Sequence, residues 1–309
     1  MRLGLDVGGT KTDAVAVAPN GTIVARTRLA TGWGPDAVVQ TILDAVANLQ
    51  ADPALTAADV RSVGIGIPGR IEPGSGRVEH AVNLGVETLD LAAAVAPVLG
   101  VPVRVENDVK AAALGAASLR GGTLSMGYLN LGTGIAAAIV TGGVLWRGAR
   151  GGAGEIGHLS IDPAGPVCRC GQRGCIEALA GGGAVSARWG RPGALPIRDV
   201  FDAADGGDAA AVLVRTDLAR GVAAAIRVLV LTADVDTVVL GGGITALGTR
   251  LQSEVAAQLE ASARESAFLR SLQLVDRVEI LPAGAPAAAL GAALIGTEAA
   301  DEREVLSHG

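Results

Sequence analysis

Short apolar runs that stop at a glycine alternate along the first half of the chain with segments of helical periodicity. Apolar side chains recur about every 3.6 residues from Val38 to Leu49, which predicts a helix that begins at Pro35. Further helices are expected over residues 89–99 and 109–119. The apolar runs predict strands over residues 2–7, 14–18, 22–29, 60–67 and 101–105.

The same order restarts in the second half with another strand that ends at a glycine turn. Strands are expected over residues 124–131, 135–141, 144–146, 237–240 and 278–281. Helices are expected over residues 178–188, 197–204, 208–231, 246–260 and 287–295, and the charged tail from Asp301 to Gly309 is expected to fray. Two copies of one α/β unit predict two lobes that face a cleft, with ligands beyond the carboxyl ends of the strands.

Composition narrows the classes of function. The 309 residues carry a net charge of −6 and 2% aromatic side chains, which disfavours nucleic acid as a partner because such binding calls for basic patches and stacking rings. The length allows two domains with ample core. No run of about 18 apolar residues predicts a membrane span. No targeting segment precedes the first expected strand, so we expect a cytoplasmic protein.

All three cysteines, Cys168, Cys170 and Cys175, follow His158 within a short stretch. Three thiolates and one imidazole complete the closed tetrahedral shell of a structural zinc ion. A disulfide scaffold is disfavoured because the number of thiols is odd, and the Cys-x-x-Cys spacing of redox proteins is missing. Buried thiols without a role stay the alternative, although such cysteines rarely cluster with arginines and glycines between them.

A carboxylate stands at each end of this stretch. Glu155 lies three residues before His158, and Glu177 lies two residues after Cys175, so a bound metal would fix both in space. The alternative is that they are surface acids. We set it aside for Glu155, because the glycines around that residue indicate a backbone that approaches a ligand closely.

Two glycine turns follow expected strands at matching places. The first has an acid before it and a hydroxyl and a cation after it, in Asp6-Val7-Gly8-Gly9-Thr10-Lys11. Its backbone N–H groups, hydroxyl and ammonium suit phosphate, and Asp6 suits hydrated Mg²⁺. The second is Gly132-Thr133-Gly134. Gly-Gly-Thr also forms ordinary hairpin turns, and neither stretch matches a Walker loop or a dinucleotide fingerprint.

Asn107 and Asp108 join an expected strand to an expected helix. Asp108 is a candidate base that accepts a proton from an alcohol as the alcohol attacks a phosphoryl group. Asn107 can both donate to and accept from a sugar hydroxyl. The alternative is that Asp108 only caps the helix, since Asp is favoured there.

Together these motifs resemble the ROK-family sugar kinases, a bacterial glucokinase-like group in the actin/hexokinase ATPase superfamily. The resemblance covers essentially the whole chain and includes Ile67-Pro68-Gly69, Gly154-Glu155-Ile156-Gly157-His158 and Gly241-Gly242-Gly243. It implies an α/β fold of two duplicated actin-like, ribonuclease H-like lobes facing a central cleft. The small lobe would be residues 1–118, joined by the C-terminal helix at about 287–300, and the large lobe, residues 119–286, would carry the zinc knuckle.

The resemblance also implies an ATP:hexose 6-phosphotransferase of carbohydrate metabolism and roles for its residues. Asp108 would be the general base. The sugar would contact Gly69, Asn107, Asp108, Glu155, His158 and Glu177. ATP and Mg²⁺ would be held by Asp6, Gly8, Gly9, Thr10, Lys11, Gly132, Thr133, Gly134, Gly242 and Gly243. Structural Zn²⁺ would be held by His158, Cys168, Cys170 and Cys175.

Three positions depart from the family pattern. Ala136 stands where the second phosphate turn commonly has glycine, Val86 where glucokinases often have tryptophan, and Arg70 where many carry another residue. The last two leave the hexose open: glucose is expected, and N-acetylmannosamine or another N-acetyl sugar is the alternative. A non-catalytic sugar-sensing ROK protein is a further alternative, although no room for a DNA-binding domain precedes Asp6. Family members are commonly homodimers or homotetramers.

Overall fold

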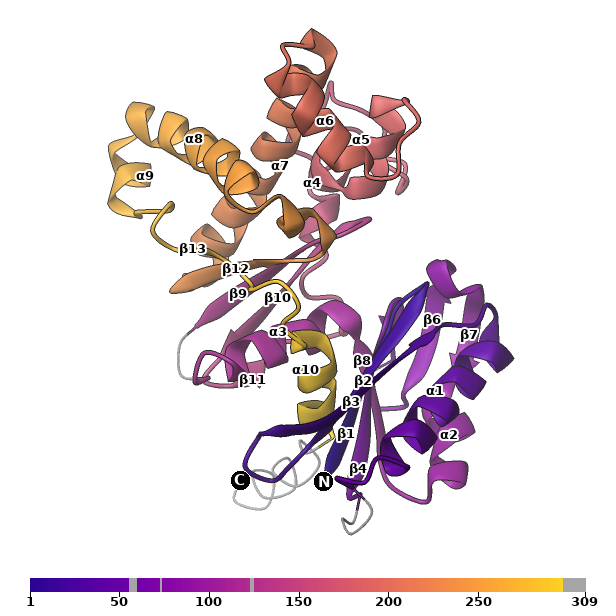
Figure 1. Cartoon of the computed structure of the whole chain (residues 1–309). Helices are drawn as coiled ribbons and strands as arrows, with labels where there is room; N and C mark the ends of the chain where they lie inside the picture. The colour runs from indigo at the N-terminus through magenta and orange to yellow at the C-terminus, as the bar shows by residue number, and fades with distance from the viewer. Residues whose placement is uncertain (56–59, 73, 123–124, 297–309) are drawn as a thin grey trace. The chain divides into compact units, whose positions relative to one another are not determined.

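The computed structural model describes residues 1–55, 60–72, 74–122 and 125–296 (Figure 1). The chain divides into two compact units. The first contains Met1–Thr123, Gly142–Ala153 and Pro286–Gly309, and the second contains Leu124–Thr141 and Gly154–Ala285. Residues 142–153, expected in the large lobe, are thus grouped with the first unit. The tail from Asp301, which we expect to fray, lies outside the described residues.

A five-stranded sheet forms the centre of the first unit, with strand order β3-β2-β1-β4-β8. Its strands are β1 (Arg2–Val7), β2 (Lys11–Val17), β3 (Ile23–Ala30), β4 (Ser62–Ile67) and β8 (Val103–Asn107). β1 is parallel to β4, and β4 is parallel to β8. The carboxyl ends of these three strands therefore meet at one edge, where Asp6 pairs with Gly66 and Ile67 pairs with Asn107.

The helices of this unit are α1 (Pro35–Gln50), α2 (Leu91–Leu99), α3 (Asp108–Ser118) and α10 (Ala287–Ile295). α1 begins at Pro35 as the periodicity predicts, and its apolar stripe is buried. α10 packs on α3, β1 and β4, so the C-terminal helix completes a unit built from the N-terminal part of the chain (Figure 1). Leu290 and Ala293 of α10 are buried against Val15 and Val17 of β2.

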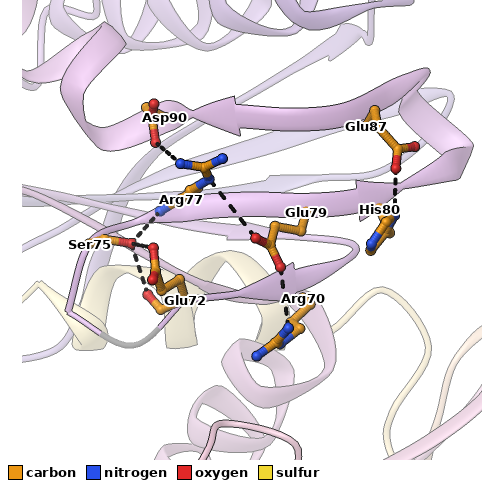
Figure 2. A network of polar contacts seen from close by, with 8 residues as sticks. All are labelled: Arg70, Glu72, Ser75, Arg77, Glu79, His80, Glu87 and Asp90. Carbon is orange, nitrogen blue, oxygen red and sulfur yellow. Dashed lines mark hydrogen bonds and ion pairs between the residues drawn. The ribbon is translucent and has the colours of Figure 1, made fainter.

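A second, three-stranded sheet in the first unit was not predicted. It has the order β5-β6-β7 and contains β5 (Arg70–Ile71), β6 (Arg77–Ala81) and β7 (Val86–Asp90), with the 3₁₀ turn η1 (Val82–Leu84) after β6. Figure 2 shows that its polar side chains form a network across the strands. Arg70 lies 3.3 Å from Glu79, and His80 lies 2.9 Å from Glu87.

The second unit repeats the arrangement around a sheet with the order β11-β10-β9-β12-β13, whose edge strand β11 belongs to the segment 142–153 that is grouped with the first unit. The strands are β9 (Met126–Leu131), β10 (Ile135–Thr141), β11 (Val144–Leu145), β12 (Thr237–Gly241) and β13 (Val278–Ile280). β10 is antiparallel to β9, whereas β12 is parallel to both β9 and β13. The prediction of a repeated α/β unit is confirmed, because β9 and β10 reproduce the glycine-linked pair of β1 and β2.

The second unit also contains a group of helices. They are α4 (Ile176–Ala180), α5 (Gly182–Trp189), α6 (Pro196–Asp205), α7 (Ala209–Ala233), α8 (Thr249–Glu265) and α9 (Ala267–Ser271), with the 3₁₀ turns η2 (Ile156–His158) and η3 (Gly243–Leu247). The single helix expected over residues 178–188 is wrong, since Gly181 has an extended backbone and separates α4 from α5. The helix expected from residue 246 begins three residues later, after Gly248.

Within the described residues, no helix is both long enough and apolar enough to cross a membrane.

Candidate active site

Asn107 and Asp108 lie where β8 passes into α3. Asn107 is the N-cap, and its Oδ1 accepts hydrogen bonds from the N–H groups of Val109 and Lys110. Its Nδ2 donates to the Gly69 carbonyl at 3.2 Å and to Asp108 Oδ1 at 3.0 Å. Asn107, rather than Asp108, therefore caps the helix, and the predicted alternative of Asp108 as the cap is wrong. The structure brings three predicted sugar contacts together here: Gly69, Asn107 and Asp108.

Two buried charges fix the segment that follows β11 against this helix start. The carboxylate of Glu106 accepts a hydrogen bond from Arg147 Nε at 2.7 Å. Lys110, in the first turn of α3, donates from Nζ to the Gly151 carbonyl. These contacts account for the grouping of residues 142–153 with the first unit. Neither Arg147 nor Lys110 lies in a motif that predicts an anchor of a site.

Asp6 lies near the end of β1, at the edge of the sheet that also holds Asn107. Loss of hydration, and then the nearby charges of Asp108 and Asp13, raise the pKa of Asp6 to about 7. The opposing effect of Lys11 is smaller. Two carboxylates close together at a strand end can share a divalent cation, which would favour the charged form of both.

The turn from Gly8 to Thr10 joins β1 to β2 as a hairpin, and the Gly8 N–H donates to the Lys11 carbonyl at 2.9 Å. That N–H is therefore used inside the turn. Gly9 and the side chains of Thr10 and Lys11 are exposed. They are the groups of this turn that can reach an anion.

Two glycine-rich segments come together in the second unit at the ends of β9 and β12. Gly241 pairs with Asn130 of β9. Gly242 has a φ of 88°, and a Cβ there would lie 2.6 Å from the carbonyl carbon and oxygen of Leu131, so no larger residue fits. The turn from Gly132 to Gly134 follows directly. The predicted phosphate and adenosine contacts Gly132, Thr133, Gly134, Gly242 and Gly243 are thus neighbours within this unit.

This turn is held by hydrogen bonds to the start of α4 and to the start of α5. The N–H groups of Gly182 and Gly183 donate to the Gly132 and Thr133 carbonyls, each at 2.9 Å. Glu177 Oε2 accepts from the Ile135 N–H at 2.9 Å. Sequence reasoning singled out Glu177 as a sugar contact but missed its bond to Ile135, because the partner is a backbone group 42 residues away.

Glu155 and His158 lie at the two ends of η2 in the second unit: Glu155 directly precedes the turn, and His158 is its last residue. Glu155 is the N-cap of this turn, and its carbonyl accepts from the His158 N–H at 3.2 Å. The preceding Gly154 carbonyl accepts from Ala137 of β10 at 2.8 Å, which attaches the segment to the sheet. The predicted sugar contacts Glu155, His158 and Glu177 therefore share one unit, whereas Gly69, Asn107 and Asp108 lie in the other.

His158, Cys168, Cys170 and Cys175 form one cluster, and their ligand atoms all lie within 4.8 Å of one another. Cys168 Sγ is 3.8 Å from His158 Nδ1, and Cys170 Sγ is 3.7 Å from Cys175 Sγ. Four tetrahedral ligands around zinc, with Zn–S near 2.3 Å, place neighbouring sulfurs about 3.8 Å apart. The donor set and its spacing therefore fit zinc.

Two thiols of this cluster, Cys170 and Cys175, have pKa values shifted in opposite directions. Hydrogen bonds from Gln172 lower the pKa of Cys170 to about 6. Burial, and then the neighbouring thiols, raise the pKa of Cys175 to about 12. A divalent cation stabilises thiolates and would offset the cost of a buried charge at Cys175.

The three departures from the expected pattern lie in the structure as follows. Ala136 is the second residue of β10, opposite Asn130, and so lies outside the turn itself. Val86 is buried at the start of β7. Arg70 pairs with Glu79 across β5 and β6 (Figure 2).

Comparison with known proteins gives relatives over nearly the whole chain. Glucokinase from Halalkalibacterium halodurans is 31% identical over 282 residues, which cover 84% of this chain and 86% of the relative. N-acetylmannosamine kinase from Escherichia coli is 34% identical over 253 residues, which cover 78% and 82%. The crystal structure of a ROK hexokinase from Thermus thermophilus has a TM-score of 0.80, 31% identity and 99% coverage of both chains. The model of the ROK family matches residues 2–298, and the chain belongs to the ROK family.

Proposed function

We propose that this protein is an ATP-dependent hexose kinase that phosphorylates the 6-hydroxyl of its sugar, with glucose as the main acceptor. The observation that carries the proposal is the arrangement at the start of α3. Asn107 caps the helix and also donates hydrogen bonds to the Gly69 carbonyl and to Asp108 Oδ1. One side chain therefore fixes the position of the candidate base relative to the Gly69 backbone. The 31% identity to a glucokinase supports glucose.

In this proposal Asp108 accepts the proton of the 6-hydroxyl as its oxygen attacks the γ-phosphoryl group. Asn107 and the Gly69 backbone bind neighbouring hydroxyls and orient the attacking oxygen. Glu155, His158 and Glu177 bind hydroxyls on the reducing side of the ring. Positioning of this kind supplies much of the rate enhancement of phosphoryl transfer, because the protein forms no covalent intermediate there.

The nucleotide would be held by the two hairpin turns. Gly9, Thr10 and Lys11 offer donors to phosphate in the first unit, and Thr133 and Gly134 do so in the second. Gly132 shapes the second turn, because its N–H donates to the Gly134 carbonyl at 3.1 Å. Gly242 and Gly243 border the adenosine. Mg²⁺, when bound, neutralises the charge that develops on the transferred group. Asp6 would anchor this ion, and its carboxylate must be ionised to do so.

Zinc at the cluster of His158 and the three cysteines would act as a scaffold, since a closed four-ligand shell leaves no position for substrate. His158 Nδ1 lies on the side of the cluster. The other ring nitrogen, Nε2, would then be the atom that bonds to a sugar hydroxyl. The ring orientation and the position of Glu155 would then depend on the metal.

An N-acetylmannosamine kinase is the second candidate function. It is favoured by the 34% identity to N-acetylmannosamine kinase from Escherichia coli. Val86, at a position where glucokinases often carry tryptophan, also favours this second candidate. Either sugar would use the same base and the same nucleotide turns. A sugar sensor without turnover is the third outcome.

The test is a coupled assay of ADP release by the purified protein. MgATP is supplied with glucose, mannose, fructose, N-acetylglucosamine or N-acetylmannosamine, and kcat/KM is compared. A preference for glucose supports the main proposal, and a preference for an N-acetyl sugar supports the second candidate. If a folded protein that contains zinc releases no ADP with any of these sugars, both candidate functions are contradicted. We further propose a cytoplasmic homodimer or homotetramer, which light scattering on the same preparation tests.

A further inference from the structure

We propose that Glu177 is a positioning residue that links the metal cluster to the Gly132–Gly134 turn, so that loss of the metal weakens nucleotide binding as well as sugar binding. The kinetic consequences rest on the proposed function. The structural link does not, because it consists of contacts within the second unit alone.

The first step runs from the cluster to α4. Cys175 is fully buried and is the N-cap of α4, so a ligand of the metal is also the residue from which the helix starts. The Ile176 N–H donates to the Leu159 carbonyl at 3.0 Å, and Ser160 and Cys175 form a β-bridge. The segment that carries His158 and the start of α4 are therefore bonded to each other directly beside the cluster.

The second step runs from α4 to the turn. Glu177, two residues after Cys175, accepts a hydrogen bond from the Ile135 N–H at 2.9 Å. A Cβ at Gly134 would lie 2.5 Å from the same Oε2 atom, so the carboxylate sits directly against the turn. A hydrogen bond to a carboxylate is about twice as strong as one between neutral groups.

The third step is the contact at the other end of the helix. The Gly181 N–H donates to the Glu177 carbonyl at 2.8 Å, and the next two N–H groups donate to the carbonyls of Gly132 and Thr133. The turn is thus held at its carbonyls by the start of α5, directly after α4, and at Ile135 by the start of α4. The contact at Ile135 depends on the position of the five-residue α4, and the contacts at the carbonyls come from the first turn of α5, which follows α4 through Gly181.

An isolated helix of five residues is unstable in water, because nucleation costs more than so few hydrogen bonds return. Its position must come from packing and from the anchor at Cys175. When a metal holds Cys175, it fixes the helix, and the helix fixes the peptide planes of the turn. When the metal is absent, the N–H groups that would face phosphate lose their fixed direction.

The experiment measures backbone amide exchange of residues 130–137 together with kinetics. Glu177→Ala removes the acceptor, whereas Glu177→Gln keeps a side-chain oxygen for the Ile135 N–H. Glu260→Ala, which deletes an exposed carboxylate on α8 of the same unit, is the matched control. Each variant is measured with metal bound, and the unmodified protein is also measured after treatment with a chelator.

We expect Glu177→Ala and chelation each to speed exchange of the Ile135 amide by at least about tenfold, as loss of a charge-assisted hydrogen bond implies. We also expect KM for MgATP to rise by about tenfold in Glu177→Ala, and Glu177→Gln to restore both values to within about threefold. Glu260→Ala should match the unmodified protein.

Two results would overturn the link: unchanged Ile135 exchange in Glu177→Ala, or unchanged exchange after the metal has been removed. A rise in KM for sugar alone, equal in the Ala and Gln variants, would also overturn it, because it assigns Glu177 to the sugar only. If the protein phosphorylates no sugar, the proposed function fails while the exchange rates and the MgATP affinity from calorimetry still decide the link.

Discussion

Arg147 Nε lies 2.7 Å from Oε2 of Glu106, whose Oε1 accepts the Asn107 N–H at 3.0 Å. The Glu106 side chain is only 9% exposed, so its charge has little access to water. One buried carboxylate thereby connects the residue before the candidate base to the segment that precedes Glu155 in the chain.

Arg147→Met should lower the free energy of unfolding by about 2–3 kcal/mol, because it leaves the Glu106 carboxylate buried without its cation. Urea denaturation measures the loss. Adding Glu106→Gln to Arg147→Met should recover part of it, since the uncompensated charge is then gone. A loss below about 0.5 kcal/mol for Arg147→Met would show that water already screens this pair.

Asp108→Ala should reduce kcat by about 10²–10⁴-fold, the range typical of general-base catalysis, while thermal unfolding stays close to that of the unmodified protein. The helix cap is Asn107, so loss of Asp108 does not remove it. Initial rates with saturating MgATP and sugar measure the effect. Turnover within threefold of the unmodified enzyme would remove Asp108 as the base.

Asp6→Asn should raise stability at alkaline pH and abolish activity. The folded protein holds the Asp6 proton up to a pKa of about 7, whereas the unfolded chain releases it near 3.8. The folded state thus binds more protons between these values, and Asp6 costs increasing stability as the pH rises through this window. The advantage of Asp6→Asn should therefore be near zero at pH 4 and full above pH 7.

Urea denaturation of the nucleotide-free protein at pH 5, 7 and 8.5 measures this advantage. Asp44→Asn, at an exposed position on α1, is the matched control and should show no such trend. A stability difference for Asp6→Asn that does not change with pH would contradict the raised pKa.

Cys170→Ser should remove zinc and sugar affinity together, because it deletes one of four ligands and His158 then loses its fixed orientation. Metal content by mass spectrometry and KM for sugar are measured on the same sample. A zinc-free variant with an unchanged KM for sugar would refute the scaffold role of the metal.

The sequence predicted the two large sheets well, because their central strands are uninterrupted apolar runs that end at glycine. It missed the β5-β6-β7 sheet, whose strands are short and alternate charged with apolar residues. Arg77 pairs with Asp90 of β7, and Glu79 pairs with Arg70 of β5 (Figure 2). Such cross-strand pairs depend on a register that periodicity does not reveal.

The cysteine cluster could be predicted because its ligands are few, close in sequence and chemically distinctive. The contacts of Glu177 and Glu106 could not be predicted, because their partners are distant in sequence: the Ile135 N–H and the Arg147 side chain. The roles of the sugar and nucleotide residues stay predictions, since they concern bound molecules.

The packing of α10 has a consequence for synthesis on the ribosome. Residues 1–286 are made before this helix, yet α10 covers β1, β4 and α3 at the centre of the first unit. The segments of the second unit all precede α10, so its sequence is complete before the helix that covers the first sheet is made. Until α10 has been made, the apolar surface of β1, β4 and α3 that it covers stays exposed. The N-terminal part of the nascent chain is therefore the part that we expect a chaperone to protect.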